Sequence, residues 1–293
     1  MKKIKGTGVA LITPFQQDQS LDLIALSKIV EGVIAGGVDF LVPLGTTGET
    51  ATLQEAELEV ILQTVTEVNA KRLPVVIGCG GNDTTQVVHK LKAFSQRWNP
   101  DAFLSVTPYY NKPSQEGLYK HYMLLADASP VPIILYNVPG RTGVNLLPAT
   151  VIRLTEHANI IGIKEASGSI EQGMELAAQC PDDFLLLSGD DTLALAHIAS
   201  GFSGVISVAA NGAPGHFSKM IQAALNSDFS TARKFHYELF LWMQLLFKEG
   251  NPAGIKAHLA NKGIIRPVLR LPLVPVSKAL EDAIVEKGKG LRG

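Results

Sequence analysis

The hydrophobic positions of this chain form eight short apolar runs that alternate with longer stretches of helical periodicity. Such runs, rich in Val, Ile and Leu and flanked by Gly, Pro or Asn, are typical of strands buried on both faces of a parallel sheet. Their starts lie roughly 20 to 35 residues apart, which leaves room for one crossover helix after each strand. The predicted strands are 9–13, 38–44, 74–78, 102–107, 132–137, 160–164, 184–188 and 204–208.

The stretches between the runs carry signals for the start of a helix. Ser20 and Ser114 stand where N-cap residues are expected, the segment 52–55 has the spacing of a capping box, and Pro148 stands in a first turn. Eight strands alternating with eight helices predict an α/β fold, a (β/α)8 TIM barrel, with a doubly wound sheet as the alternative.

The periodicity changes after the eighth strand and helix. Three further helical patterns follow at 229–247, 254–262 and 276–287, separated by proline-containing segments. We therefore predict a barrel catalytic domain over residues 1–226 and a C-terminal helical extension over residues 227–293.

Composition narrows the class of protein. The chain has 293 residues, a hydrophobic fraction of 46% and a formal net charge of −1, without a long basic or acidic block. Neither a nucleic acid nor a membrane is expected as a partner, because no basic patch and no run of roughly 18 apolar residues occurs. The two cysteines, Cys79 and Cys180, make neither a disulfide framework nor a metal pattern, so a cytoplasmic protein with free thiols is expected.

One predicted strand ends in a lysine. Residues 160–163 are apolar or small, and Lys164 closes the run. Alternation along the strand places Ile160, Gly162 and Lys164 on one face, where Gly162 is expected to leave room for the lysine stem. Burial favours the neutral amine, which is a nucleophile towards ketones. The alternative is a strand-end lysine that reaches water or pairs with Glu165.

Tyr136 ends the strand that precedes the one with Lys164. If the two strands are neighbours, they lie about 4.8 Å apart, and the phenol can reach the amine. A phenol beside a Schiff base can act as a general acid and then as a base. A plain strand-end tyrosine is the alternative for Tyr136 taken alone.

Other strand ends offer groups that could hold a carboxylate. The segment 45–48 (GTTG) combines the hydroxyls of Thr46 and Thr47 with backbone N–H groups in a turn bounded by glycines. Arg141 lies between Gly140 and Thr142 in a predicted loop and could bind a carboxylate through two hydrogen bonds. The alternatives are an ordinary turn for 45–48 and a solvated surface arginine for Arg141.

Two other types of site find little support. The segment 78–83 (GCGGND) follows a strand, but Asp83 stands where a dinucleotide-binding loop has its last glycine. The seven histidines show no spacing typical of metal ligands, so a metal site has little support. Asp190 and Asp191 are interpreted as the start of a helix rather than as a carboxylate pair.

Six motifs in order closely resemble the dihydrodipicolinate synthase family, which belongs to the pyruvate-dependent class I aldolases of the neuraminate lyase superfamily. The resemblance extends from about residue 6 to residue 275 and is weakest in the helical extension. The motifs are 45–49 (GTTGE), 107–119 (TPYYNKPSQEGLY), 136–143 (YNVPGRTG), 161–168 (IGIKEASG), 188–191 (SGDD) and 204–208 (GVISV).

The resemblance implies a reaction. Pyruvate would condense with L-aspartate 4-semialdehyde to give 4-hydroxy-2,3,4,5-tetrahydrodipicolinate, the committing step of lysine and diaminopimelate biosynthesis. The implied enzyme is a Schiff-base-forming lyase without a metal or a dissociable cofactor, assembled as a homotetramer. Lys164 would bind pyruvate covalently, and Tyr136 would transfer protons to and from the Schiff base.

The resemblance also assigns roles to residues on other strand ends. Thr46 and Tyr110 would complete a hydroxyl relay with Tyr136, and Tyr110 would reach into the site of a neighbouring subunit. Arg141 would bind the carboxylate of the semialdehyde. The implied pyruvate-binding residues are Thr47 and the backbone of Ile206, and Gly189 is implied as a further substrate-binding residue.

Inhibition by lysine is expected to be weak or absent. Members of the family that lysine inhibits share an allosteric site with histidines and a glutamate. Here Asn82 and Tyr109 match that site, but Glu55 and Leu58 stand where histidines are common, and Gln86 replaces the glutamate. Loss of that charge-assisted hydrogen bond corresponds to about 1.5–3 kcal/mol of binding free energy. The remnant of this site would comprise Thr50, Ala51, Glu55, Asn82, Gln86 and Tyr109.

Two other functions remain open from the sequence. A related pyruvate aldolase could act on a keto sugar acid such as N-acetylneuraminate or 2-keto-3-deoxygluconate. Arg141 and the pair Tyr109 and Tyr110 favour the semialdehyde instead. A catalytically silent barrel that senses a keto acid is the other alternative, and it would be expected to lack Lys164 or Tyr136.

Overall fold

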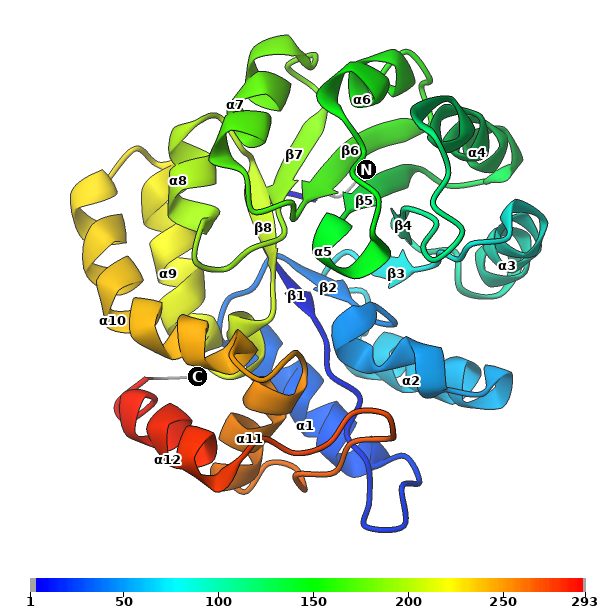
Figure 1. Cartoon of the computed structure of the whole chain (residues 1–293). Coiled ribbons are helices and arrows are strands. Elements are labelled where there is room, and N and C mark those ends of the chain that lie inside the picture. The colour runs from blue at the N-terminus through cyan, green and yellow to red at the C-terminus, as the bar shows by residue number, and fades with distance from the viewer. Residues whose placement is uncertain (1–3, 292–293) are drawn as a thin grey trace. The chain divides into compact units, whose positions relative to one another are not determined.

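The structure is a computed structural model that describes residues 4–291 (Figure 1). It contains eight strands, and a helix follows each of them along the chain, so the predicted (β/α)8 barrel fold is confirmed. The chain divides into two compact units. One comprises residues 74–206 with residues 4 and 5, and the other comprises residues 6–73 with the chain from residue 207 onward.

The unit formed by residues 74–206 contains six parallel strands that pair in chain order from β3 to β8. Most of its helices lie along the outer side of these strands in Figure 1, so that side of the strands is covered. Its strands are β3 (Val76–Gly78), β4 (Ala102–Val106), β5 (Ile133–Asn137), β6 (Ile160–Glu165), β7 (Leu185–Ser188) and β8 (Gly204–Ser207), whose last residue belongs to the other unit. Its helices are α3 (Thr84–Trp98), α4 (Gln115–Ala128), α5 (Pro139–Thr142), α6 (Pro148–Leu154), α7 (Ile170–Gln179) and α8 (Ala194–Ala199).

The second unit combines the start of the chain with its end. Strand β1 (Gly6–Ala10) pairs in parallel with β2 (Phe40–Val42). Helix α10 (Phe229–Phe247) packs against its three helical neighbours α9, α11 and α12. The other helices of this unit are α1 (Leu23–Ala35), α2 (Glu55–Asn69), α9 (Pro214–Leu225), α11 (Ala253–Asn261) and α12 (Lys278–Lys287), with three single 3-10 turns, η1 (Thr46–Gly48), η2 (Thr50–Thr52) and η3 (Ala209–Asn211).

Most helices begin close to their predicted starts, but the starts of α1 and α2 need a correction. Asp22 caps α1 through its carboxylate, because the predicted cap Ser20 instead bonds to Asp18. The predicted capping box at 52–55 is also wrong, since the 3-10 turn η2 ends there. The box lies two residues later, where the Glu57 carboxylate accepts the Gln54 backbone N–H at 2.9 Å.

All eight predicted strands exist, and the largest shift affects the first. Strand β1 begins at Gly6 and ends at Ala10, whereas the prediction placed it at residues 9–13. The three predicted C-terminal helices correspond to α10, α11 and α12. The predicted domain boundary between residues 226 and 227 concerns a different division from the two compact units and stays a prediction. No helix among residues 4–291 is long and apolar enough to cross a membrane.

Candidate active site

Lys164 and Tyr136 lie side by side in the sheet. Strands β5 and β6 are parallel neighbours, and their register aligns Tyr136 with Lys164. The Lys164 ammonium lies 4.3 Å from the centre of the Tyr136 ring, and both side chains are less than a tenth exposed. The strand pairing that the sequence analysis assumed is therefore present, and it places an amine and a phenol within reach of one another.

A different glycine from the predicted one makes room for the lysine. A Cβ atom on Gly162 would meet the Cβ and the carbonyl oxygen of Leu185 at 2.5 Å, so Gly162 allows β7 to approach β6. A Cβ atom on Gly189 would lie 3.0 Å from Cε of Lys164. The expectation that Gly162 accommodates the lysine stem is wrong, and Gly189 has that part because it follows the neighbouring strand β7.

Arg141 belongs to a short helix rather than to the predicted loop. Helix α5 follows β5 directly, with Pro139 at its first position, and it ends at Gly143, whose φ of 72° favours glycine. Arg141 is exposed. The Asn137 side-chain oxygen accepts the backbone N–H of Leu146 at 2.9 Å, so the segment carrying Arg141 is closed at its base.

Tyr109 and Tyr110 follow strand β4 and point into solvent. Tyr110 is 88% exposed and has a φ of 73°, a left-handed conformation that is costly for a bulky residue. Two hydrogen bonds hold this turn. Asn82 Nδ2 donates to the Tyr109 carbonyl at 3.1 Å, and Asn111 Nδ2 donates to the Asn82 carbonyl at 2.9 Å. The Tyr110 side chain therefore projects into solvent from a turn that these two hydrogen bonds hold on either side.

The threonine loop, residues 45–48, belongs to the unit that contains residues 6–73 and lies between two residues with positive φ. Leu44 and Glu49 have φ values of 58° and 54°, and the 3-10 turn η1 lies between them. Thr47 is buried and its hydroxyl accepts Asn251 Nδ2 at 3.0 Å, whereas Thr46 is exposed. The loop therefore holds one threonine hydroxyl by a buried contact and leaves the other open to solvent.

The remaining predicted substrate residues lie at strand ends of the unit formed by residues 74–206. Ile206 is buried near the end of β8. The backbone N–H of Gly189 donates to the Glu165 carbonyl at 2.7 Å, which extends the β6–β7 pairing beyond the strands. The Asp190 carboxylate accepts the backbone N–H groups of Thr192 and Leu193 in the turn before α8. The interpretation of Asp190 and Asp191 as the start of this helix is wrong, because α8 begins at Ala194 and Leu193 is its cap residue.

Residues 3–288 match the model of the family described as "Dihydrodipicolinate synthetase family". The chain belongs to the dihydrodipicolinate synthetase family.

Proteins named 4-hydroxy-tetrahydrodipicolinate synthase or dihydrodipicolinate synthase resemble the chain over almost its whole length. The 4-hydroxy-tetrahydrodipicolinate synthase of Flavobacterium psychrophilum is 49% identical over 287 residues, 97% of each chain. The dihydrodipicolinate synthase structure from Thermotoga maritima is 37% identical with a TM-score of 0.94, and the match covers 97% of this chain and 98% of that one. The chloride-inhibited enzyme of Acinetobacter baumannii, complexed with pyruvate, is 38% identical with a TM-score of 0.96, over 99% and 100% of the chains. The predicted family and enzyme class are confirmed.

In this member of the dihydrodipicolinate synthetase family, a buried ion pair supports the threonine loop. Lys256 of α11 and Glu49, directly after the loop, are both fully buried and form a salt bridge. Glu49 also accepts the backbone N–H of Arg270 at 3.0 Å. The centre of the Phe15 ring lies 4.3 Å from the Lys256 ammonium and 4.4 Å from the Arg270 guanidinium. Burial lowers the pKa of Lys256 to about 8.

The sequence analysis missed Lys256 and Asn251, two residues of the predicted C-terminal extension that bond to Glu49 and to Thr47 respectively. A signal was present, since Lys256 interrupts an apolar stretch and α11 is buried over most of its length. Nothing in that stretch could identify Glu49 as its partner, because 207 residues separate the two along the chain.

The residues of the expected allosteric remnant divide between the two units. The Thr50 hydroxyl donates to the Gly45 carbonyl at 2.9 Å, while Ala51 and Glu55 are exposed. In the other unit, Asn82 contacts Tyr109 as described, and Gln86 is exposed in the first turn of α3.

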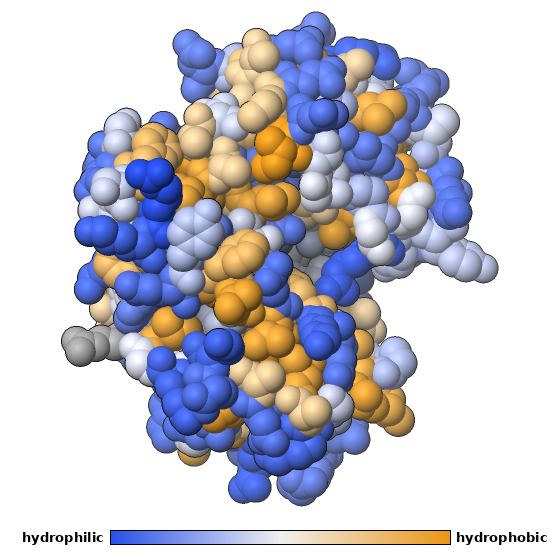
Figure 2. All heavy atoms as spheres, turned by 60° about the vertical axis from the view of Figure 1, so that its left-hand side comes forward, coloured by the Kyte–Doolittle hydropathy of each residue, from blue (hydrophilic) through white to orange (hydrophobic). Residues whose placement is uncertain are grey.

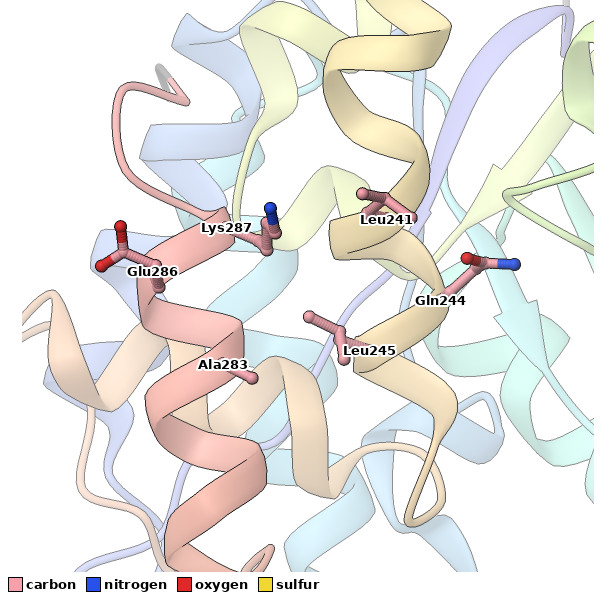
Figure 3. Close-up of a pocket in the computed structure, with 6 residues that line it drawn as sticks. All are labelled: Leu241, Gln244, Leu245, Ala283, Glu286 and Lys287. Atoms are coloured by element: carbon pink, nitrogen blue, oxygen red, sulfur yellow. The ribbon is translucent and has the colours of Figure 1, made fainter.

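Other features that could make a binding or reactive site are a metal-ligand cluster, a reactive thiol and a ligand pocket. Residues 4–291 contain no group of three or more His, Cys, Asp or Glu that could hold a metal ion. Burial raises the pKa of Cys79 to about 12 and that of Cys180 to about 11, so both thiols stay protonated. A pocket of about 390 Å³ lies between α10 and α12 (Figure 3), and its walls are mostly apolar. It is lined by Leu241, Gln244, Leu245, Ala283, Glu286 and Lys287.

The face of the molecule seen in Figure 2 carries both hydrophilic and hydrophobic residues. The exposed apolar side chains of α10 are Tyr237, Leu241 and Phe247.

Proposed function

We propose that this chain condenses pyruvate with L-aspartate 4-semialdehyde to give 4-hydroxy-2,3,4,5-tetrahydrodipicolinate, in lysine and diaminopimelate biosynthesis. The observation that carries the assignment is the buried amine of Lys164 beside the Tyr136 ring. The reaction is the one for which the relatives are named, and one neighbour is a complex with pyruvate.

The first step joins pyruvate to the enzyme. The neutral Lys164 amine attacks the keto carbon, and the carbinolamine loses its hydroxyl as water when it receives a proton, which leaves a protonated Schiff base. Tyr136 supplies that proton, because the register places its phenol beside the lysine. The phenolate then takes a proton from the pyruvate methyl carbon, and an enamine forms.

The second step forms the new carbon–carbon bond. The enamine carbon attacks the aldehyde carbon of the semialdehyde, and the aldehyde oxygen takes up a proton. The amino group of the semialdehyde then attacks the Schiff-base carbon. Expulsion of the Lys164 amine closes the ring and restores the free enzyme, so no external oxidant or reductant is needed.

Resemblance to the family assigns the remaining roles. Arg141, exposed on α5, binds the carboxylate of the semialdehyde through paired N–H donors. Thr46 and Tyr110 relay protons with Tyr136. The residues that hold pyruvate are Thr47, the backbone of Ile206, and Gly189, which borders the lysine stem.

We further propose a cytoplasmic homotetramer in which Tyr110 enters the site of a neighbouring subunit. The support for this role is the 88% exposure of Tyr110 together with its strained φ, which presents an aromatic side chain to solvent. Neither a nucleic acid nor a membrane is part of this proposal.

Borohydride trapping tests the covalent step. Borohydride added with pyruvate should reduce the Schiff base and leave a stable adduct on Lys164, detected as a mass increase of the tryptic peptide. Lys164→Ala should abolish the adduct, while Lys5→Ala, at an exposed position, should keep it. Absence of an adduct on the intact protein would refute the proposal. Turnover with a sugar aldehyde in preference to the semialdehyde would instead select a keto sugar acid aldolase.

A further inference from the structure

Glu165 is a fully buried carboxylate that directly follows Lys164 on β6. Because side chains alternate along a strand, the carboxylate lies on the face opposite the ammonium. One carboxylate oxygen accepts the backbone N–H of Ser167 at 2.5 Å. The other accepts Nδ2 of Asn137 and Nε2 of Gln172, each at 3.0 Å. Glu165 thus joins the end of β6 to the end of β5 and to the first turn of α7.

Asn137 occupies the matching position on the neighbouring strand. It directly follows Tyr136, is fully buried, and is aligned with Glu165 in the register of β5 and β6. Two residue pairs therefore bridge these strand ends. Tyr136 and Lys164 form one pair on one face, and Asn137 and Glu165 form the other pair on the opposite face.

Asn137 also closes the segment that carries Arg141. Its side-chain oxygen accepts the Leu146 backbone N–H at 2.9 Å, and its side-chain nitrogen donates to Oδ1 of Asn145 at 2.7 Å. Arg141 lies on α5, in the segment of chain between Asn137 and these two bonded residues. The position of α5 is therefore tied to the same asparagine that bonds to Glu165.

Two further amides complete the network. Asn145 Nδ2 donates to Oε1 of Gln172 at 2.8 Å, and Gln172 Nε2 donates to Glu165. Asn137, Asn145, Gln172 and Glu165 thus form a closed ring of hydrogen bonds centred on one buried negative charge. Hydrogen bonds to a charged group are stronger than those between neutral groups, so the carboxylate is the strongest acceptor in this ring.

We propose that Glu165 and Asn137 are positioning residues that fix Lys164, Tyr136 and Arg141 relative to one another. This inference rests on the proposed function, in which those three groups act on pyruvate and the semialdehyde. Neither positioning residue takes part in a bond-forming step. The Glu165 carboxylate holds the ends of β5 and β6 in register through its bond to Asn137. Through the same asparagine it holds the segment that carries α5.

Glu165→Gln is the first test, since it keeps the shape and removes one acceptor. In either orientation the NH2 group of the new glutamine would face an N–H donor, either that of Ser167 or those of Asn137 and Gln172. At least one hydrogen bond of the network would therefore be lost. We expect the rate of borohydride-trapped adduct formation and kcat to fall about 10- to 100-fold, because misplacement by about 1 Å can cost about 100-fold. The KM for the semialdehyde should rise as α5 loses its anchor. The matched control is Glu171→Gln, the same change at an exposed position on α7.

The exchange variant Asn137→Asp with Glu165→Gln is the second test. It transposes acid and amide, and the ring closes again when the Asn145 and Gln172 amides turn over and exchange their nitrogen and oxygen positions. We expect kcat of this double variant to exceed that of either single variant at least tenfold. A purely structural role predicts instead that folded single variants keep the wild-type kcat, KM and adduct rate.

The outcomes separate this inference from the proposed function. A wild-type protein that forms no pyruvate adduct would refute the proposed function itself. A wild-type adduct together with unchanged kinetics in folded Glu165→Gln, or an exchange variant no better than the singles, would overturn the positioning role alone. If the single variants do not fold, Gln172→Leu at a half-buried position replaces them. There a threefold or larger loss in adduct rate supports the inference, and an unchanged rate contradicts it.

Discussion

Replacement of Lys256 by methionine tests the buried ion pair that supports the threonine loop. Lys256 and Glu49 are both fully buried, and the ammonium also donates to the Val268 carbonyl at 2.9 Å. Methionine fills most of the space of the lysine stem but leaves the Glu49 carboxylate without its cation. Removing one partner of a buried pair destabilises a protein by about 3–5 kcal/mol.

A second route sets an upper bound on that cost. The stranded carboxylate can take up a proton, which for an ordinary glutamate with a pKa of about 4.3 costs about 3.7 kcal/mol at pH 7. The destabilisation of Lys256→Met should therefore be about 3–4 kcal/mol at pH 7. It should shrink by up to about 1.4 kcal/mol for each pH unit below 7, because protonation becomes cheaper.

Urea unfolding at one fixed protein concentration measures this effect, since assembly makes stability depend on concentration. The control is Lys278→Met, which removes an ammonium that is paired with Glu281 and Asp282 at the surface, where the lysine side chain is 75% exposed. That change should cost about 0–1 kcal/mol. A loss below about 1 kcal/mol for Lys256→Met, or a loss that does not depend on pH, would refute the reasoning.

Three further predictions concern the lysine pocket, acid stability and regulation. Gly189→Ala places a Cβ 2.5 Å from the Cβ of Ala166 and 3.0 Å from Cε of Lys164. The trapped pyruvate adduct should therefore form about 10- to 100-fold more slowly. An unchanged rate would contradict the steric role of Gly189. Burial lowers the pKa of His121 to about 4, so the stability it contributes is present above pH 6.5 and is lost as the pH falls towards 4, by about 3 kcal/mol at most. His121→Gln should flatten the thermal unfolding profile between pH 6.5 and 4 relative to the wild type, and a parallel profile would contradict this assignment. L-lysine should inhibit weakly or not at all, because exposed Gln86 replaces the expected glutamate; full inhibition at submillimolar lysine in a steady-state assay would exclude this interpretation.

The local pattern of the chain was sufficient to predict the secondary structure and the chemistry of single positions. Short apolar runs at regular spacing indicated the strands, because only buried parallel strands combine such runs with intervening helices. Lys164 stood out because burying a charged group at the end of an apolar strand costs desolvation free energy, so such a residue is a candidate for a functional role. Errors appeared where neighbouring short polar residues compete to cap a helix, as at Ser20 and Asp22.

The partners of these residues were decided only by the tertiary structure. Periodicity specifies which face a side chain occupies, but not which distant segment packs on that face. Gly189 therefore borders the lysine in place of Gly162, and Asn137 meets Glu165 across neighbouring strands. Lys256 meets Glu49 across 207 residues of chain for the same reason. The sequence by itself determined the fold class and the position of Lys164 at the end of a buried strand, whereas the contacts around Lys164 and around residues 45–48 arise only when distant segments pack together.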